Sequence, residues 1–269
     1  MSERAVQIAQ RNHRMKKKNQ AVIYTVEGAV ALVTLNRPEK RNALDDEIVA
    51  EIRAALREAA NDETARVVLL TGAGKDFCSG ADLAALQRIS AATVTENLED
   101  ARHLADLFIE MRRHPRPIAA AVRGRALAGG CGLATACDLV FAAESAQFGY
   151  PEVNIGFIPA MVMAILRRSV SEKRAFELIT LGKIIAAPVA AEIGLVNATF
   201  ADDEFDARVE ATVAELAGKS ASAVMLAKNL LYHMDGMTME TALEAGAQLN
   251  AITRMTEDCR RGVARFLKK

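Results

Sequence analysis

Two glycine-rich segments carry the residues whose types and spacing could do chemistry. In one of them, the apolar run from Pro117 to Val122 is followed by Gly124, Gly129 and Gly130. A strand that enters glycines opening a helix aims unpaired backbone N–H groups at one point, where they can bind negative charge. This segment therefore predicts an anion site.

The kind of anion follows from the neighbouring residues. The spacing of Gly124 and Gly129 fits the outer frame of a phosphate-binding loop, but Gly130-Cys131 stands where that loop needs Lys followed by Ser or Thr. A phosphate site is therefore excluded. Backbone amides followed by one carboxylate, Glu152, better suit a charge that exists only briefly, such as the oxygen of an enolate.

A similar arrangement occurs earlier in the chain. The β-branched and apolar residues 67–70 are followed by Gly72 and Gly74, but the third glycine of a dinucleotide-binding fingerprint is replaced by Phe77. Nucleotide binding is thus excluded, and what remains is a second strand end that can present one backbone N–H, most plausibly at Ala81. Two such donors would form an oxyanion hole for a thioester carbonyl.

The order of these motifs resembles the enoyl-CoA hydratase/isomerase (crotonase) family over nearly the whole chain from about residue 21. The matching stretches are ALVTLNRP (31–38), NAL (42–44), SGADL (79–83), LAGGC (127–131), CDL (137–139), AQFG (146–149) and PE (151–152). The resemblance implies an α/β fold in which repeated β-β-α units wind as a spiral, followed by C-terminal helices. It also implies an enzyme of fatty acid metabolism that acts on an acyl-CoA thioester without a further cofactor.

The resemblance assigns roles to individual residues. The amides of Ala81 and Gly129 would hold the thioester oxygen, and Glu152 would be the catalytic acid/base. The implied substrate and CoA contacts are Arg41, Ala43, Gly80, Asp82, Leu83, Gly130, Pro151, Phe266 and Lys269. The last two match a terminal phenylalanine and lysine that reach CoA in the family, sometimes across a subunit boundary.

One departure from the family concerns the reaction itself. Hydratases of the family carry a second glutamate directly after the Gly-Gly-Cys element, where this chain has Gly132. Two carboxylates help hydration by orienting water, whereas double-bond migration needs a single base. Gly132 favours migration but leaves hydration open, because Glu96, Glu99 or Asp100 could supply the missing carboxylate, or Glu152 could act alone.

Composition limits the other classes of function. The chain has 34 basic and 34 acidic residues, which argues against nucleic acid or an anionic membrane as its main partner. Four cysteines without a C-x-x-C pair indicate a reduced, cytoplasmic protein without disulfides. The four histidines share no metal-binding spacing, and no apolar run reaches the ~18 residues of a membrane helix.

The first 19 residues form a basic extension with a single acid, Glu3. A solvated polar tail is favoured over a transit peptide or an electrostatic arm. The alternative to an enzyme is a non-catalytic acyl-CoA-binding or RNA-associated protein of the same fold, with this extension as its contact.

The pattern of elements predicts three regions: the extension (1–19), a core with the acyl-CoA site (20–200) and a helical oligomerisation region (201–269). Residues 21–35 predict a hairpin, 67–70 and 117–122 predict strands, and Ile48 to Leu56 and Leu104 to Met111 predict helices. Further helices are predicted at 171–182, 187–193, 203–218, 221–234 and 238–253, with a strand at 195–200. In the resembling family such C-terminal helices form trimers, often paired into hexamers.

Overall fold

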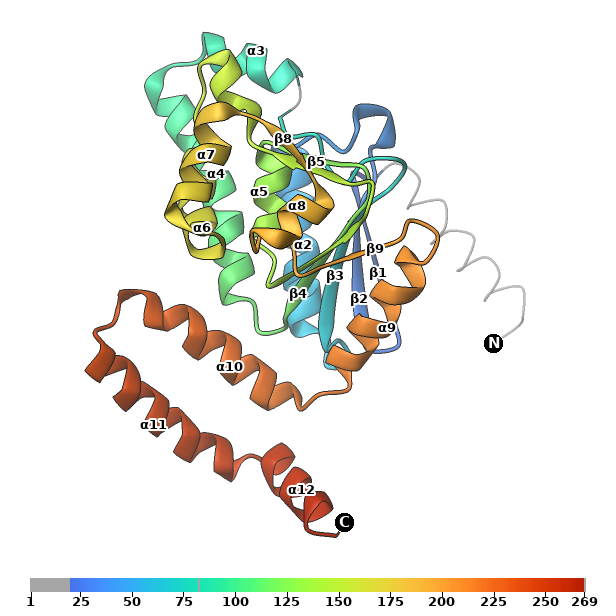
Figure 1. Cartoon of the computed structure of the whole chain (residues 1–269), viewed down its shortest axis with the longest axis vertical. Coiled ribbons are helices and arrows are strands. Elements are labelled where there is room, and N and C mark those ends of the chain that lie inside the picture. Colours follow the sequence, from blue (N-terminus) through green and yellow to red (C-terminus); the bar gives the residue numbers. More distant parts are fainter. Residues whose placement is uncertain (1–19, 82, 269) are drawn as a thin grey trace, which may run out of the picture.

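The computed structural model describes residues 20–81 and 83–268. Within these residues, a six-stranded sheet runs in the order β1-β2-β3-β4-β6-β9, parallel except for the β1–β2 pair, and a smaller sheet has the order β5-β7-β8 (Figure 1). The strands are β1 (Val22–Glu27), β2 (Val30–Leu35), β3 (Val67–Gly72), β4 (Ile118–Val122), β5 (Arg125–Leu127), β6 (Leu139–Ala143), β7 (Gln147–Gly149), β8 (Ile184–Ala186) and β9 (Ala198–Phe200).

Helices alternate with these strands, and the chain after β9 is helical. The α-helices are α2 (Asp46–Asn61), α3 (Leu83–Ala91), α4 (Val94–Arg113), α5 (Gly129–Thr135), α6 (Ala160–Ser169), α7 (Glu172–Leu181), α8 (Ala187–Glu192), α9 (Phe205–Ala217), α10 (Ala221–His233), α11 (Met239–Met255) and α12 (Glu257–Phe266). Short 3-10 helices lie at η2 (Pro38–Lys40), η3 (Pro151–Ile155) and η4 (Met234–Gly236). The order β1-β2-α2, β4-β5-α5 and β6-β7-η3-α6 shows the expected repetition of β-β-α units.

The predicted hairpin and first helix are confirmed. β1 pairs antiparallel with β2, with Glu27 opposite Val30, and Gly28 takes the turn with a φ of 60°. Asp45 caps α2 by accepting a hydrogen bond from the Ile48 amide, which satisfies one of the free donors at the start of the helix. The residues predicted to form the apolar face of α2 are buried.

Both faces of the larger sheet are covered by helices (Figure 1). β4 is buried at every position, and this explains why its sequence is continuously apolar rather than alternating. On one face, α9 packs Phe205, Val209 and Val213 against β3, β4 and β6. The main core, to which α2, α4, α5 and α6 contribute, fills the other face and carries the functional loops.

One sequence-based expectation needs correction. The apolar run 117–122 does not lead directly into the glycines that open a helix, because β5 lies between Gly124 and Gly129. Gly124 makes the turn between β4 and β5 with a φ of 57°, and a Cβ there would lie 2.0 Å from the Lys75 carbonyl oxygen. The close approach of these two backbone segments requires glycine.

Asp138 connects α10 to the core through hydrogen bonds. Its Oδ2 accepts hydrogen bonds from the Ile118 amide (2.6 Å) and the buried Lys228 ammonium (2.7 Å), and its Oδ1 accepts one from the Tyr232 hydroxyl (2.5 Å). Beyond α10 the chain extends away from the sheets as α11 and α12, in which no described residue is buried (Figure 1).

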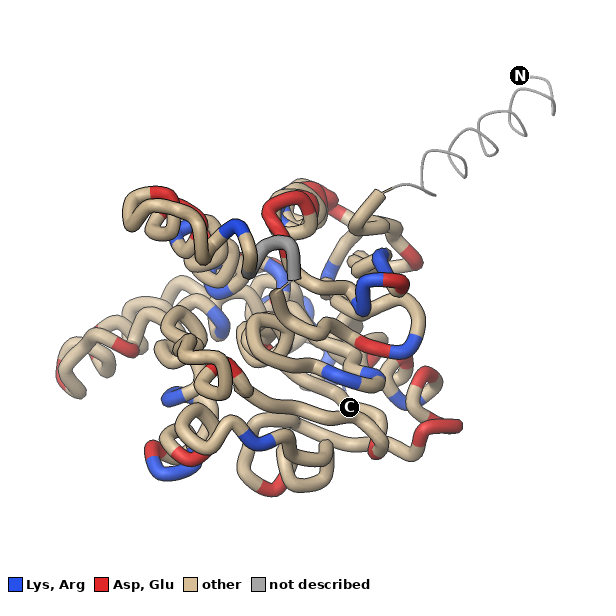
Figure 2. The backbone as a smooth tube through the Cα atoms, turned by 90° about the horizontal axis from the view of Figure 1, so that it is seen from above, with Lys and Arg blue, Asp and Glu red and all other residues tan. Residues whose placement is uncertain are grey.

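Charges are distributed over the described chain without a clear division into an acidic and a basic side (Figure 2). The basic extension, residues 1–19, lies outside the described residues. Among the helices that the structure describes, none combines the length and the apolar character needed to cross a membrane.

Candidate functional site

The loop that ends at Ala81 is held between two backbone segments. On one side Cys78 pairs with β5, since its amide donates to the Arg125 carbonyl (3.0 Å) and its carbonyl accepts from the Leu127 amide (3.0 Å). On the other side the Leu44 amide donates to the Gly80 carbonyl (2.7 Å). These bonds hold the loop that carries the predicted donor Ala81 at the end of the smaller sheet.

Gly80 brings the two predicted donors together. Its φ is 92°, and a Cβ at this position would lie 2.7 Å from the Ala128 Cβ and 3.6 Å from the Gly129 nitrogen. Any side chain here would separate the Ala81 loop from the start of α5. The structure therefore places the Ala81 and Gly129 segments side by side, as the sequence predicts.

The start of α5 leaves its first amides without helical partners. The first hydrogen bond of the helix runs from the Gly132 amide to the Ala128 carbonyl (3.0 Å). Ala128, the N-cap, has a φ of 50°, a conformation that costs a non-glycine residue roughly 1–3 kcal/mol and that is often found at functional sites. Within the described residues, neither the Ala81 nor the Gly129 amide has a hydrogen-bond acceptor.

Glu152 lies in η3, directly after Pro151, and its side chain is partly buried. Its Oε2 is fully buried and has no hydrogen-bond partner among the described residues. Burial raises the pKa of the Glu152 carboxyl above its usual range, although a hydrogen bond from its own backbone amide acts in the opposite direction. A carboxylate in this state is a stronger base than one in water and is free to take up a proton.

The burial of Glu152 predicts a pH-dependent change in stability. Because its pKa is higher in the folded than in the unfolded protein, the ionised form destabilises the fold above the folded pKa, and this penalty disappears below the unfolded pKa. Glu152→Gln should therefore raise the melting temperature at neutral pH, and the gain should shrink as the pH falls. Calorimetric melting of both proteins between neutral and acidic pH tests this; an equal gain at every pH would contradict it.

The second-carboxylate position, Gly132, is closed by packing. A Cβ on Gly132 would lie 2.4 Å from Val162 Cγ2 and 3.5 Å from Phe108 Cζ, and Val162 is 3% exposed. The sequence does not predict this contact with Val162, because packing between α5 and α6 leaves no pattern in the sequence.

The other carboxylates proposed for hydration have neighbours of their own. Glu96 closes a capping box with Thr93 at the start of α4. Burial and the nearby charge of Asp46 on α2 raise the pKa of the Asp100 carboxyl, and Glu99 is exposed. None of these contacts involves Glu152.

Some of the predicted CoA contacts lie beside the Ala81 segment, whereas Phe266 lies far from it in the same chain. Arg41 and Ala43 belong to the loop that packs on the Ala81 segment: the Arg41 carbonyl accepts from the Ser79 amide (3.1 Å), while Ala43 is buried and its carbonyl accepts from Arg37 Nη2 (2.9 Å). Phe266 is 78% exposed on α12, which lies apart from α3 and α5 in the same chain (Figure 1).

The remaining predicted contacts lie at element ends or outside the described residues. Leu83 and Pro151 begin α3 and η3, and Gly130 is buried, where a Cβ would meet the Cys78 carbonyl oxygen at 2.3 Å. Asp82 and Lys269 lie outside the described residues. Within the described residues no three His, Cys, Asp or Glu side chains gather in a way that could hold a metal ion.

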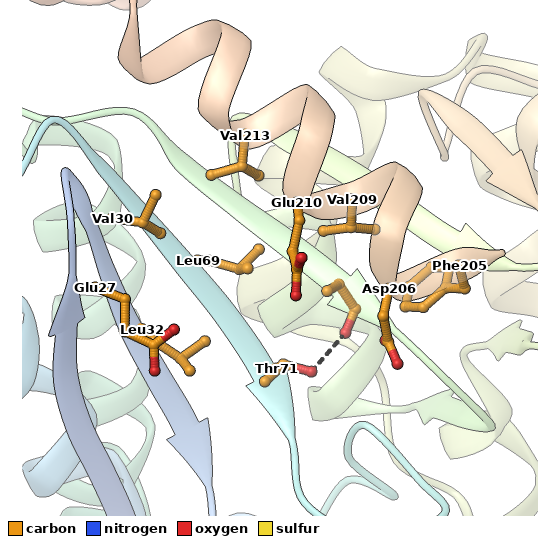
Figure 3. Close-up of a pocket in the computed structure, with 11 residues that line it drawn as sticks. Glu27, Val30, Leu32, Leu69, Thr71, Phe205, Asp206, Val209, Glu210 and Val213 are labelled. Atoms are coloured by element: carbon orange, nitrogen blue, oxygen red, sulfur yellow. Dashed lines mark hydrogen bonds between the residues drawn. The ribbon is translucent and has the colours of Figure 1, made fainter.

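A cavity of about 300 Å³ lies elsewhere, between the larger sheet and α9 (Figure 3). Its apolar floor includes Leu32 and Leu69, and it also contains the carboxylates of Glu27, Asp206 and Glu210. Acidic side chains repel the phosphates of CoA. This cavity includes none of the predicted site residues, so it is separate from the candidate site.

Comparison with known proteins agrees with the fold and the ordered motifs. The enoyl-CoA hydratase/isomerase family model matches residues 25–269. A Thermus thermophilus protein provisionally named an enoyl-CoA hydratase is 40% identical over 92% of this chain and 98% of its own length. The 2,3-dehydroadipyl-CoA hydratase of Escherichia coli is 34% identical over 89% of this chain and 92% of its own.

A solved structure gives the same result in three dimensions. The enoyl-CoA hydratase of Mycobacterium smegmatis superposes with a TM-score of 0.89 and 31% identity, covering 93% of this chain and 97% of that one. The spiral α/β fold expected from the resemblance is thereby confirmed. The chain belongs to the enoyl-CoA hydratase/isomerase family and is an enzyme of the crotonase fold.

Proposed function

We propose that the protein binds an acyl-CoA thioester with its carbonyl oxygen between the Ala81 and Gly129 amides, and that Glu152 transfers the proton. The observation that carries this proposal is the buried Glu152 Oε2, which has no partner among the described residues. The Ala128 amide donates to the Gly149 carbonyl (2.8 Å), so the segment that leads to Glu152 is attached to the start of α5, where the Gly129 amide lacks an acceptor within the described residues. The E. coli relative, named for a hydratase of 2,3-dehydroadipyl-CoA, supports an enoyl-CoA thioester as the class of substrate.

The chemistry follows from the charge that develops on the thioester. Removal of a proton beside the carbonyl, or addition of a nucleophile to the conjugated double bond, places negative charge on the carbonyl oxygen. Preorganised amides lower that barrier, and the loss of one such donor typically costs a factor of about 10²–10³ in turnover. In migration from a 3-enoyl thioester, ionised Glu152 would take a proton from carbon 2 and deliver it to carbon 4; in hydration it would take a proton from the attacking water and deliver it to carbon 2.

Migration of the double bond is the favoured reaction. It needs one base that removes a proton from one carbon and returns it to another, and Val162 occupies the space beside Gly132 where a second carboxylate would begin. Hydration by Glu152 alone is the second candidate, and the hydratase names of the relatives favour it.

One screen distinguishes the two reactions. Short, branched and long 2-enoyl-CoA and 3-enoyl-CoA thioesters would be incubated with the enzyme, and the products separated and weighed by mass spectrometry: hydration adds the mass of one water, whereas migration gives an isomer of unchanged mass. We expect migration to exceed hydration on the best substrate. Hydration without migration on every thioester would favour the second candidate, and no reaction with any would contradict the proposal.

The acyl-CoA site also bears on assembly, for which we propose a trimer or a dimer of trimers. Leu243 and Ile252 on α11 and Val263 and Phe266 on α12 are each more than half exposed. So much apolar surface on α11 and α12, which pack mainly on α10 and on each other, favours burial against another copy of the chain. Such packing could bring Phe266 to a neighbour's CoA site.

Light scattering at micromolar concentration tests the assembly. We expect a mass of three or six chains, and Leu243→Glu should lower it, because a charge placed in an apolar interface is costly. Val94→Glu is the matched control, since Val94 is also exposed but lies on α4. A wild-type protein that is monomeric would contradict the assembly and any role for Phe266 in a neighbouring site.

A further inference from the structure

The side chains of Tyr150 and Thr135 and the backbone carbonyl of Cys131 form a continuous series of hydrogen bonds. Tyr150 is 0% exposed, and its hydroxyl oxygen lies 2.8 Å from Thr135 Oγ1. Thr135 Oγ1 in turn donates to the Cys131 carbonyl oxygen at 2.7 Å. A threonine hydroxyl has one hydrogen, so with this hydrogen on the carbonyl, Tyr150 must be the donor to Thr135.

These bonds join the two halves of the proposed site. Cys131 and Thr135 belong to α5, whose first residue is Gly129, and Tyr150 lies two residues before Glu152. At the start of α5, the Ala128 amide donates to the Gly149 carbonyl (2.8 Å). The segment that carries Glu152 is therefore attached to both ends of the short helix that presents the Gly129 amide.

Only Pro151 separates Tyr150 from Glu152, so a constraint on Tyr150 also restricts the position of Glu152. Pro151 fixes its own φ near −65° and removes one backbone freedom between the two residues. Burial, followed by several smaller effects that include the charge of Glu152, raises the pKa of the Tyr150 hydroxyl and raises that of the Cys131 thiol to about 12. Both groups consequently stay protonated, and Tyr150 keeps the hydrogen that it donates.

We propose that Tyr150 is a positioning residue: its hydrogen bond to Thr135 sets the place of Glu152 relative to the Gly129 amide. This inference rests on the proposed function, since it requires Glu152 to transfer the proton. A group that acts through geometry affects the proton-transfer step rather than the binding of the thioester.

The test compares steady-state kinetics of Tyr150→Phe, Thr135→Val, Thr135→Ser and the double variant Tyr150→Phe/Thr135→Val, using the best thioester of the screen above. A hydrogen bond between neutral groups contributes on the order of 1 kcal/mol, so kcat should fall about fivefold in each of the first two variants while KM stays nearly unchanged. The double variant should lose little more than either single one, and Thr135→Ser should keep most of the activity.

Tyr24→Phe is the matched control. The Tyr24 hydroxyl on β1 is also buried, but it has no hydrogen-bond partner among the described residues, so its removal should leave kcat unchanged. An unchanged kcat in Tyr150→Phe, or independent losses that multiply in the double variant, would overturn the positioning role. Glu152→Gln assayed in parallel separates the two proposals: near-normal turnover in that variant would overturn the proposed function itself, whatever Tyr150→Phe does.

Discussion

Glu152→Gln is expected to lower turnover of an enoyl-CoA thioester by on the order of 10³-fold, within the range typical for removal of a general acid/base. The substitution replaces the proton carrier with an amide of nearly the same shape, so the pocket should keep its form. Affinity for the thioester should remain nearly unchanged. Steady-state kinetics and titration calorimetry on the same preparation measure both quantities.

An exposed glutamate provides the control for this experiment. Glu144 lies between β6 and β7, and Glu144→Gln makes the same chemical change on the surface. Its kinetics should equal those of the wild type. If Glu152→Gln also retained turnover, another residue would be the base, and Asp100 on α4 would be the first to examine.

Gly132→Glu is expected to destabilise the protein by several kcal/mol. Val162 is a stiff, β-branched residue that is almost fully buried, so it cannot easily move away from a new side chain 2.4 Å from its Cγ2. The new carboxylate would also lose its hydration. Thermal unfolding should therefore occur at a clearly lower temperature than in the wild type.

A second change should restore the space. In Gly132→Glu/Val162→Ala both Cγ atoms of Val162 are gone, and we expect the double variant to be more stable than Gly132→Glu. If the new carboxylate reaches the substrate, the ratio of hydration to migration should rise, and coupling with Glu152 should shift the pH profile of hydration. Product ratios on one thioester measure the change.

Matched variants separate the steric effect from the chemistry. Gly132→Ala and Gly132→Ala/Val162→Ala add the same Cβ as the two glutamate variants but no carboxylate. Their ratios of hydration to migration should stay at the wild-type value. A folded Gly132→Glu/Val162→Ala with an unchanged ratio would show that position 132 does not face the reacting carbons. Gly132 would then no longer favour migration over hydration.

The sequence predicts those elements that have strong local signals. The hairpin of β1 and β2 consists of two runs rich in β-branched residues with a glycine at the turn between them. Helix α2 has both a capping aspartate and a periodic apolar face. By contrast, α6 was not predicted: it begins after Pro159 without a side-chain cap. β5, β7 and β8 have three residues each, too few to show a period.

The site is predictable to a similar degree. Ordered motifs single out Ala81, Gly129 and Glu152 as candidates, because glycines and a lone carboxylate are visible in the sequence. Contacts between distant elements are not visible there. The positive φ of Ala128 and the bond between Tyr150 and Thr135 depend on how α5 packs, and both required the structure.

Proton exchange at the substrate shows whether Glu152 transfers the proton. A 3-enoyl-CoA thioester would be incubated with the enzyme in D₂O, and deuterium in the recovered thioester would be followed by mass spectrometry. Enolate formation by Glu152 predicts conversion to the 2-enoyl isomer in the wild type, with deuterium taken up in those turnovers in which the Glu152 proton exchanges with solvent before it is returned, and neither change in Glu152→Gln. Equal isomerisation and deuterium uptake in the two proteins would contradict the assignment of Glu152 as the group that transfers the proton.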